Sequence, residues 1–525
     1  METKPTDLKI ENDTIFLRFN FNKDTISQAK ECGLKWNGIR RAWIGPATAT
    51  TLLGLLHFFP ELSPSLTSLI PEKINDYYPS DYLMDHQKEA GKIGQKYLRY
   101  GFFDDTGTGK TLAGIELIKQ KKIKTLVVCK LSLITNAWIK DLARFAPELR
   151  IVNLWEFHKR KKKIPDHDVG IINYEQFRTT HKKLTGYKMV LADESSVLKD
   201  HRSLTTKAMT AYCDTVFYVY LFSGTPAPNN ELEYFSQMRI IDPLLLGRSF
   251  YTFRNQFCYS TGYGGYQWKM RSDRRMEFLD KISQVSRVIR KEDCLTLPER
   301  TFNNRTVSLS TKEMESYREM EREMILEFEG QESVAANAAV KIMKLRQGTS
   351  GFYYDSNGQV IQVGDSKLES LIELLEEIGN HQVIIWTHFR HEADRITSWM
   401  GAEGLSHARG DGTVADQRIK DRIVLDFMEG KIKYLVAHPA SLGHGVTLTN
   451  CTYAVYFSLS HSFEQAYQSA DRIYRHGQRN ACTYYRLIVP GTIDEAILKA
   501  LENKESVVNS VFAYLRKEKG KSHEV

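Results

Sequence analysis

Short apolar runs alternate with helical patterns through much of this 525-residue chain. Leu126–Cys129, Val169–Asn173, Met189–Ala192 and Val216–Phe222 are nearly continuous hydrophobic segments, which is typical of strands buried on both faces. Between such runs, segments like Leu112–Ile118 carry hydrophobic residues at helical spacing. Strands that alternate with helices indicate a parallel sheet with helices on its faces, so the pattern predicts an α/β protein.

The pattern also divides the chain. A second set of α/β patterns begins with an amphipathic helix at Lys367–Ile378 and a strand at Val383–Thr387. Before it, helical patterns such as Lys312–Phe328 and Ala335–Arg346 dominate. We therefore expect a small unit at 1–70, a first α/β lobe at 72–228, a helical insertion and linker at 229–365, a second α/β lobe at 366–495 and a C-terminal helix at 496–525.

The small first unit has a pattern of its own. Ile15–Phe21 alternates like a strand and Lys23–Cys32 has helical spacing. Trp36–Ile44 resembles a hairpin with its turn at Asn37-Gly38. This order of elements predicts a small α+β domain.

Composition narrows the class of protein. Hydrophobic residues make up 42% and charged residues 26%, as in an ordinary globular protein. No apolar run approaches the length of a membrane span, and the first residues lack the pattern of a signal peptide. The 7 cysteines form no Cys-x-x-Cys pair, which favours a reducing compartment and argues against a zinc site. The net charge of +8 is compatible with a polyanionic partner, although a basic surface also serves solubility alone.

A glycine-rich loop lies between the apolar pair Phe102-Phe103 and the helical segment that follows it. Its glycines allow backbone N–H groups to turn inward around phosphate oxygens at a helix N-terminus. The lysine of such a loop reaches the β- and γ-phosphates, and the next hydroxyl binds Mg²⁺. A plain strand-to-helix turn would not need Lys-Thr at this place. The residues expected to bind ATP are Thr106, Gly107, Thr108, Gly109, Lys110 and Thr111.

Two acidic residues, Asp193 and Glu194, follow the buried strand Met189–Ala192. An aspartate at a strand end can hold the water shell of Mg²⁺, and the neighbouring glutamate can orient and deprotonate an attacking water. An exposed acidic turn would be an equal alternative if this segment stood alone. With the glycine-rich loop upstream, the pair indicates ATP hydrolysis.

Two further segments carry candidate chemistry. Ser223, Gly224 and Thr225 end another apolar strand, where small hydroxyl residues can sense phosphate; a plain turn is the alternative. Far downstream, Arg472 and Arg475 lie three residues apart in a segment with helical spacing. Such arginines can stabilise transition-state charge as fingers, and a solvated basic helix face is the alternative.

These pieces, in this order, resemble superfamily 2 helicase-like ATPases, most closely the Swi/Snf-type DNA translocases. The resemblance covers residues from about 78 to about 500. The segments that resemble the family motifs are Leu83–Gln87 (Q-motif), Thr125–Trp138 (Ia), Ile171–Glu175 (Ib), Gln382–Thr387 (IV), Ala437–Thr449 (V) and Arg472–Gln478 (VI). One departure is Ser196, which stands where the family usually has histidine. The form of motif V looks bacterial or phage-like.

The resemblance implies a fold and further site residues. It implies two RecA-like lobes with parallel sheets, and it implies ATP and Mg²⁺ as cofactors. Thr111 and Asp193 would then hold the magnesium ion, while Lys110, Glu194, Arg472 and Arg475 would act in catalysis. Gln87, Gly445 and Gln478 would also contact the nucleotide. Ser132 and Trp138 would line the DNA path.

The first unit is similar to the HARP-type domain attached to annealing helicases. Lys35, Arg40 and Arg41 offer cations, and Trp36 and Trp43 offer stacking surfaces for DNA. The alternative is that the two tryptophans build a small core. On the first reading, Lys35, Trp36, Arg40 and Arg41 bind DNA.

The resemblance implies an ATP-dependent translocase on duplex or branched DNA, without sequence preference. With the HARP-like unit, the expected work is fork regression, strand annealing or Holliday-junction branch migration. A remodeller that displaces proteins from duplex DNA is the main alternative, and an ATP-gated DNA-binding switch is another. We expect a monomer in the cytoplasm of a bacterium or of a phage-infected cell, with no membrane partner.

Overall fold

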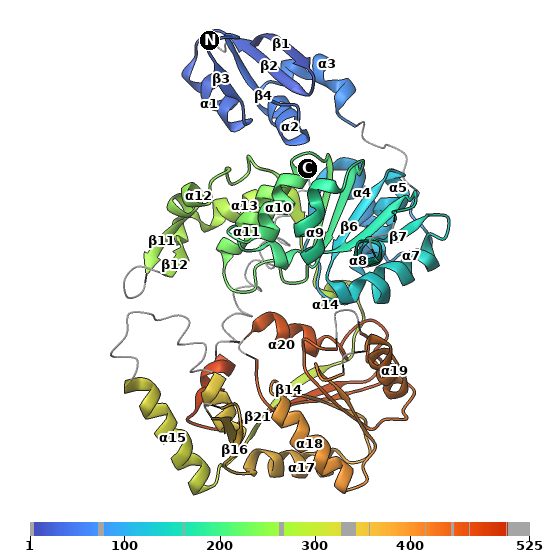
Figure 1. Ribbon diagram of the computed structural model, residues 1–525, viewed down its shortest axis with the longest axis vertical. Coiled ribbons are helices and arrows are strands. Elements are labelled where there is room, and N and C mark those ends of the chain that lie inside the picture. Colours follow the sequence, from blue (N-terminus) through green and yellow to red (C-terminus); the bar gives the residue numbers. More distant parts are fainter. Residues whose placement is uncertain are drawn as a thin grey trace. The chain divides into compact units, whose positions relative to one another are not determined.

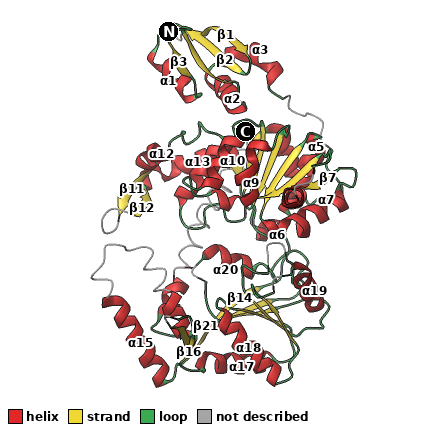
Figure 2. Ribbon diagram, viewed as in Figure 1, coloured by secondary structure: helices red, strands yellow, loops and turns green. Residues whose placement is uncertain are grey.

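The computed structural model describes residues 5–71, 78–160, 163–261, 267–326, 343–355, 357–414, 416–442, 446–460, 462–499 and 501. The described chain forms two compact units, which meet in the sequence between Cys294 and Leu295. Helices and parallel strands alternate in both of them (Figure 2). The expected α/β fold with two RecA-like lobes is confirmed.

The N-terminal module is a four-stranded antiparallel sheet with helices packed on it (Figure 1). Its strands run in the order β1 (Pro5–Glu11), β2 (Thr14–Phe19), β4 (Ala42–Pro46) and β3 (Lys35–Asn37). The helices are α1 (Lys23–Glu31), α2 (Ala49–Phe58) and α3 (Ser63–Leu66). Asn22 caps α1 by accepting hydrogen bonds from the amides of Asp24 and Thr25. The module is the small α+β domain that the sequence predicts.

Lobe 1 is built on a seven-stranded parallel sheet. In spatial order the strands are β13 (Ser286–Arg287), β5 (Arg99–Phe102), β10 (Tyr218–Phe222), β9 (Met189–Asp193), β6 (Thr125–Cys129), β8 (Val169–Asn173) and β7 (Ile151–Asn153). Val127 and Leu191 belong to one core cluster, together with every second residue of the neighbouring strands. Their alternate neighbours Val128 and Val190 are buried as well. Both faces of the sheet are therefore covered, which explains the continuous apolar runs.

Helices cover this sheet. Side chains of α4, α5 and α7 share the core cluster with the strands, and α11 and α13 contact β5. Strands β11 (Cys258–Thr261) and β12 (Gln267–Met270) pair antiparallel with each other. The helices of lobe 1 are α4 (Asp85–Lys96), α5 (Lys110–Lys121), α6 (Leu131–Leu133), α7 (Lys140–Phe145), α8 (Leu154–Arg160), α9 (Tyr174–Thr180), α10 (Leu204–Cys213), α11 (Tyr234–Ile241), α12 (Phe250–Phe257), α13 (Arg275–Val285) and α14 (Lys291–Cys294).

Lobe 2 has a six-stranded parallel sheet of its own. Its spatial order is β14 (Arg300–Thr306), β21 (Cys482–Ile488), β20 (Tyr453–Tyr456), β17 (Val383–Trp386), β19 (Tyr434–Ala437) and β18 (His407–Gly410). Side chains of α17 and α18 form the core with these strands. The helices are α15 (Thr311–Leu326), α17 (Ser366–Ile378), α18 (Arg390–Ala402), α19 (Gln417–Met428) and α20 (Phe463–Ala470), and β15 (Phe352–Tyr354) pairs with β16 (Val360–Gln362).

The expected insertion at 229–365 is not separate from the lobes. β13 pairs with β5 in the lobe 1 sheet, and β14 pairs with β21 in the lobe 2 sheet. Both strands are too short or too polar to stand out in the sequence, since β14 is mostly exposed. The C-terminal helix expected at 496–525 lies almost wholly outside the described residues, as does part of the helical pattern at Ala335–Arg346.

Candidate functional site

The glycine-rich loop connects the C-terminal end of β5 to the first residue of α5. Gly107 and Gly109 adopt φ of 82° and 80°, and Gly109 is the N-cap of α5. A side chain at Gly109 would collide with the Gln87 amide, so glycine is required there for close approach as well as conformation. Lys110 Nζ donates to the carbonyls of Asp104 and Asp105, each at 2.8 Å. The loop therefore has the backbone conformation that a phosphate cradle requires, and its binding of phosphate stays a prediction.

Helix α4 braces this loop from the side. Gln87 Nε2 donates to the Thr108 carbonyl at 3.2 Å, and His86 Nε2 lies 2.7 Å from the same oxygen. Gln87 is buried, and its Oε1 accepts from the Met84 amide. The structure therefore brings Gln87 to the nucleotide loop, as expected, while contact of its side chain with a nucleotide stays a prediction.

Asp193 ends β9 in a buried position at the same edge of the sheet. Its Oδ2 accepts from Trp138 Nε1 at 2.9 Å, and its Oδ1 accepts from the Glu194 amide at 2.9 Å. Burial raises the pKa of Asp193 to about 6, helped by the charge of Glu194, and the Trp138 hydrogen bond and the Lys110 charge oppose this rise. Lys110 and Asp193 are thus electrostatic neighbours, although they are far apart in sequence.

The expectation that Trp138 lines the DNA path is wrong. Trp138 is fully buried in the lobe 1 core, on a π-helical turn at Ile134–Ile139, and its indole orients Asp193. The π turn directs the ring inward against Gly114, where an added Cβ would lie 2.7 Å from the indole. Ser132, earlier in this segment, is half-buried, and its contact with DNA stays a prediction.

Glu194 has the geometry of a residue held for function. It adopts a left-handed φ of 54°, which is strained for a residue with a side chain. Its Oε2 is buried and has no hydrogen-bond partner among the described residues, and the same holds for the hydroxyls of Thr106 and Thr225. Buried polar atoms without partners are costly, so their convergence around a phosphate cradle fits a bound nucleotide with its metal and water.

The turn Ser223–Thr225 packs directly against the glycine-rich loop. It follows β10, which lies between β5 and β9 in the sheet. A Cβ added at Gly224 would lie 2.7 Å from Thr106 Cγ2, so the absence of a side chain permits this approach. The three strand ends that the sequence singled out are therefore neighbours. That arrangement suits a turn that responds to the state of the phosphates.

Gln237 of α11 links two of these strand ends, and sequence reasoning missed it. It is fully buried, accepts from the Ser195 hydroxyl at 2.7 Å and donates to the Pro226 carbonyl at 2.7 Å. The link from the Asp193-Glu194 turn therefore starts at Ser195, one residue before the serine that replaces the usual histidine. A lone glutamine inside a helical pattern carries no sequence signal.

A buried ion pair supports the loop from its other side. Arg287 Nη2 donates to Asp104 Oδ2 at 2.7 Å and also to the His86 carbonyl. The Lys291 amide donates to Asp105 Oδ2. The short strand β13 and the residues after it therefore fix the backbone that leads into the cradle. This support was also not predicted.

Lobe 2 holds the two candidate finger arginines. Arg472 and Arg475 each donate from Nη1 to the Val446 carbonyl at 3.3 Å. They do not lie on a helix, because α20 ends at Ala470, whose carbonyl accepts from the Tyr484 hydroxyl. The segment with helical spacing that contains Arg472 and Arg475 is therefore not helical at these two residues, which corrects that prediction. Burial lowers the pKa of Arg475, and its role as a finger stays a prediction.

The remaining motif V and VI residues have different outcomes. Gln478 is buried; its Nε2 donates to the Cys451 and Ile473 carbonyls, and its Oε1 accepts from the two amides that follow it. The amide group of Gln478 therefore makes all its hydrogen bonds within lobe 2. This corrects the expectation that its side chain contacts nucleotide. Gly445 lies outside the described residues.

Comparisons with protein families agree with this geometry. Residues 100–351 match the SNF2-related domain, and residues 366–477 match the helicase conserved C-terminal domain. The chain is an SNF2-family superfamily 2 ATPase. The matches imply a DNA-dependent ATP hydrolase, and the roles of the individual candidate residues stay predictions.

Three relatives resemble this SNF2-family chain at low identity. Putative protein p41 of Acyrthosiphon pisum secondary endosymbiont phage 1 is 27% identical over 61% of this chain and 70% of its own length. The SWI/SNF-related matrix-associated actin-dependent regulator of chromatin subfamily A-like protein 1 homolog of Caenorhabditis elegans is 26% identical over 88% of this chain and 66% of its own length. DNA repair and recombination protein RDH54 of Saccharomyces cerevisiae is 25% identical over 77% of this chain and 50% of its own length.

A solved structure of the Sulfolobus solfataricus SWI2/SNF2 ATPase core in complex with dsDNA is also similar. It is 22% identical, and the match covers 84% of this chain and 95% of that one with a TM-score of 0.39. None of the helices among the described residues of this SNF2 ATPase has the length and apolar character that a membrane crossing requires.

The N-terminal module of the ATPase presents an aromatic and basic hairpin. Trp43 is 7% exposed and belongs to the core, whereas Trp36 is 56% exposed. Their rings lie 5.8 Å apart, so Trp36 extends an aromatic row that begins inside the module. The sequence left both tryptophans open to either role, and the structure divides the roles between them. Lys35, Arg40 and Arg41 are exposed nearby.

The turn of this hairpin is longer than expected. Asn37 pairs with Ala42 across β3 and β4, so the turn comprises Gly38–Arg41 rather than Asn37-Gly38. The left-handed residue is Arg41, with φ of 48°. Asn37 Oδ1 accepts from the Arg40 amide at 3.0 Å and closes the turn through its side chain. The Asn-Gly pair therefore does not form the two-residue turn that its sequence favours.

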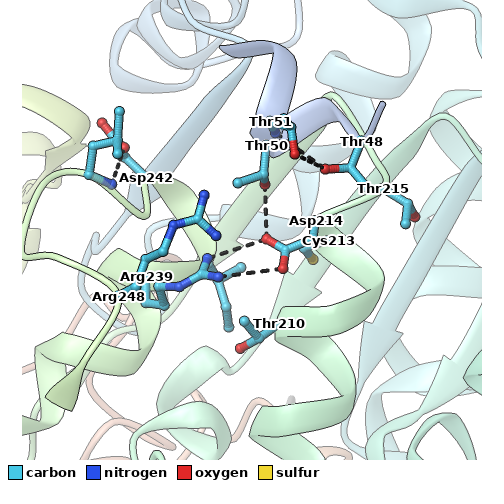
Figure 3. A network of polar contacts seen from close by, with 12 residues as sticks. Thr48, Thr50, Thr51, Thr210, Cys213, Asp214, Thr215, Arg239, Asp242 and Arg248 are labelled. Carbon is cyan, nitrogen blue, oxygen red and sulfur yellow. Dashed lines mark hydrogen bonds and ion pairs between the residues drawn. The ribbon is translucent and has the colours of Figure 1, made fainter. Parts of the chain in front are cut away.

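A polar seam joins this module to lobe 1 within the first unit. Figure 3 shows Thr50 of α2 directed at Asp214, which also receives Arg239 of α11. Thr50 Oγ1 donates to Asp214 Oδ1 at 2.9 Å and accepts from buried Arg99 at 3.2 Å. Arg248 donates to the Glu31 carbonyl at 2.6 Å. The seam uses side chains from both partners, so each buries polar groups that the other satisfies.

Proposed function

We propose that this SNF2-family ATPase is a DNA translocase that remodels branched DNA, by fork regression, strand annealing or branch migration. The observation that carries the proposal is the pairing of a glycine-rich loop and its neighbouring acidic turn in lobe 1 with an exposed aromatic and basic hairpin on a module docked to that lobe. One relative is named as a DNA repair and recombination protein, which supports a function in the same processes.

The nucleotide site has a role for each group. The cradle at Gly107–Thr111 binds the phosphates of ATP, and Thr111 and Asp193 hold Mg²⁺, which neutralises phosphate charge when bound. Glu194 orients the attacking water and takes its proton. Gln237 transmits the state of the site to the Ser223–Thr225 turn. Arg472 and Arg475 of lobe 2 are the candidate groups for transition-state charge.

The hairpin gives the module its candidate DNA contacts. Trp36 offers a flat face for an unpaired base, and Lys35, Arg40 and Arg41 offer charge for the phosphates on either side. Phosphate contacts carry no sequence information, so binding is sequence-independent and weakens as salt rises. Unpaired bases occur at junctions and not inside intact duplexes, which is why this hairpin favours branched substrates.

A remodeller of protein–DNA complexes is the second candidate. This candidate is favoured because one relative is named as a regulator of chromatin. Such an enzyme needs only duplex translocation, so its ATPase would respond equally to plain and branched duplexes. An ATP-gated binding switch would hydrolyse ATP without moving and would displace no triplex strand.

The test compares ATPase rates of the full chain on single-stranded, duplex, forked and four-way DNA of equal length. The proposal predicts the highest kcat/KM for DNA on the forked or four-way substrates, together with ATP-dependent conversion of the four-way junction into duplexes. Equal stimulation by duplex and junction, with no junction conversion but with displacement of a protein from duplex DNA, would favour the second candidate.

A further inference from the structure

The tip of the β3–β4 hairpin carries an apolar side chain that no packing explains. Ile39 is 95% exposed, although it lies in a turn between two arginines and a glycine. Phe21, which follows β2, is 81% exposed. The β2–β4 register pairs Leu17 with Trp43, so the chain after β2 runs toward the hairpin tip. Two exposed apolar side chains therefore share one end of the module.

The turn that carries Ile39 is held in place. The Arg40 amide donates to Asn37 Oδ1, and the Arg18 guanidinium donates to the Arg40 carbonyl at 3.4 Å. Arg41 adopts a left-handed conformation, which is unfavourable in free energy for any residue that has a side chain. Strain and side-chain bonds that fix a turn are typical of loops that present a side chain in a defined direction.

The charges around Ile39 identify its partner. From Lys35 to Pro46 there are three cations, Lys35, Arg40 and Arg41, and no carboxylate. One carboxylate of β1, Asp7, does lie at this end of the sheet, where it forms an ion pair with Arg18 at 3.1 Å. The acidic residues of the nearby β1–β2 turn, Glu11 and Asp13, lie at the opposite end of the sheet, because Thr14 pairs with Pro46. An apolar tip flanked by cations complements stacked bases flanked by phosphates.

We propose that Ile39 is a wedge that inserts between base steps at a DNA branch point. It parts the bases, Trp36 stacks on the base that is released, and Arg40 and Arg41 hold the adjacent phosphates. Apolar side chains that enter a base step replace stacking with their own contact and kink the duplex. Since a branch point is already partly unstacked, the wedge enters there at lower cost than in an intact duplex.

The seam connects the proposed wedge to the motor. The hairpin belongs to the module that Thr50 and Arg99 connect to lobe 1, so the wedge follows the lobe that binds ATP. This inference rests on the proposed function, and it adds the residue that acts on the bases.

The experiment uses the full chain without ATP and DNA with 2-aminopurine, a base whose fluorescence rises when it unstacks. The probe is placed at the branch of a four-way junction and, separately, in the middle of a duplex. Wild type is expected to raise the branch signal and not the duplex signal. Ile39→Ala is expected to lose most of this rise, about fivefold, while Ile39→Leu keeps it. Leu204→Ala, which removes an exposed leucine of α10, is the matched control and is expected to match wild type.

A second readout follows ATP-dependent junction conversion by the same proteins. Ile39→Ala is expected to slow conversion about tenfold at unchanged duplex-stimulated ATPase, because the motor is intact. Since Ile39 is exposed, its loss leaves the module folded, and equal melting temperatures check this. A branch signal in Ile39→Ala equal to that of wild type overturns the wedge. Absence of junction conversion by wild type instead overturns the proposed function, and the ATP-free signal still decides whether Ile39 unstacks bases.

Discussion

The nucleotide site and the hairpin tip use opposite physical strategies. Around Asp193 and Glu194 the polar side chains are buried; both Asp193 oxygens have defined partners, and Glu194 Oε2 has none among the described residues. At the tip, Ile39 and Trp36 are exposed, and only the backbone beneath them is fixed. Burial tunes chemistry by removing water, whereas exposure on a rigid support serves contact with a large partner.

This difference separates the expected effects of mutation. Changes in the buried site stop the motor on every DNA substrate. Changes at the tip leave the motor intact and alter only its work on branched DNA. The predictions below test this separation, beginning with the largest effect.

The largest effect is expected from Lys110→Ala and Glu194→Gln. Each should lower ATP turnover by about a thousandfold or more on all DNA substrates, because one loses the phosphate charge and the other the base. DNA binding should change little, and Glu194→Gln should still bind ATP. Lys122→Ala, at the exposed end of α5, is the control. Near-normal turnover in Lys110→Ala or Glu194→Gln would refute the site assignment.

Arg475→Ala should lower kcat by about a hundredfold with a modest loss of ATP affinity, because a finger acts in the transition state. Arg472→Ala should have a similar effect on kcat. Because Arg472 is buried, its loss should also lower the stability of the protein. Steady-state kinetics measures the loss of kcat, and nucleotide-binding measurements give the loss of ATP affinity. Normal kcat at saturating ATP with much weaker binding would make these arginines ground-state ligands.

Gln237→Met keeps the volume of the side chain and removes its hydrogen bonds to Ser195 and Pro226, together with a longer one to the Glu233 carbonyl. If Gln237 positions the Ser195 and Pro226 turns, DNA stimulation of the ATPase should fall about tenfold while the KM for ATP is unchanged. Melting temperature should be followed in parallel. A matched fall in stability and in basal activity, with DNA stimulation intact, would make the residue a packing element only.

The raised pKa of Asp193 predicts a pH dependence. Because burial lifts this pKa from its ordinary value to about 6, the ionised carboxylate costs the empty site stability. This cost is full above pH 6 and declines as the pH falls from 6 toward the ordinary value of 3.8. Bound Mg²⁺ with nucleotide offsets the cost. The rise in melting temperature caused by Mg²⁺-nucleotide should therefore be larger at pH 7.5 than at pH 5.5, and Asp193→Asn should remove most of this difference. A rise independent of pH in wild type would contradict it.

The smallest effect is expected at the seam. Thr50→Val removes hydrogen bonds to Asp214 and Arg99 and should cost about 1–3 kcal/mol of stability, because the partners stay buried. Thr48→Val, at the N-cap of the same helix, is a comparison variant that leaves the seam intact. Junction conversion should fall more in Thr50→Val than in Thr48→Val. An equal fall in junction conversion in the two variants would show that the seam does not couple the module to lobe 1.

The two regions also differ in what the sequence could predict. The cradle and the Asp193-Glu194 pair were found because their chemistry requires those residue types at those spacings. The supports were not: Gln237 and Arg287 act through contacts between distant segments, and Trp138 was placed on the DNA path because a motif locates a segment but not the direction of its side chains. Periodicity also overran the end of α20, where a tertiary hydrogen bond from Tyr484 stops the helix.

For the hairpin, the sequence pattern predicts the two strands but leaves the roles of the tryptophans open. Trp36 and Trp43 form a direct cross-strand pair and therefore lie on the same face of the sheet. They differ in burial because β3 is the edge strand. Ile39 was overlooked because its exposure depends on the real length of the turn.

The most direct test is junction conversion by the double variant Trp36→Ala with Arg40→Ala in the full chain, measured beside its duplex-stimulated ATPase. Both residues are exposed, so the nucleotide site and the seam stay intact. The account predicts that conversion of a four-way junction falls at least tenfold while the ATPase stays within about twofold of wild type. Conversion at the wild-type rate would contradict the assignment of branched-DNA work to this hairpin.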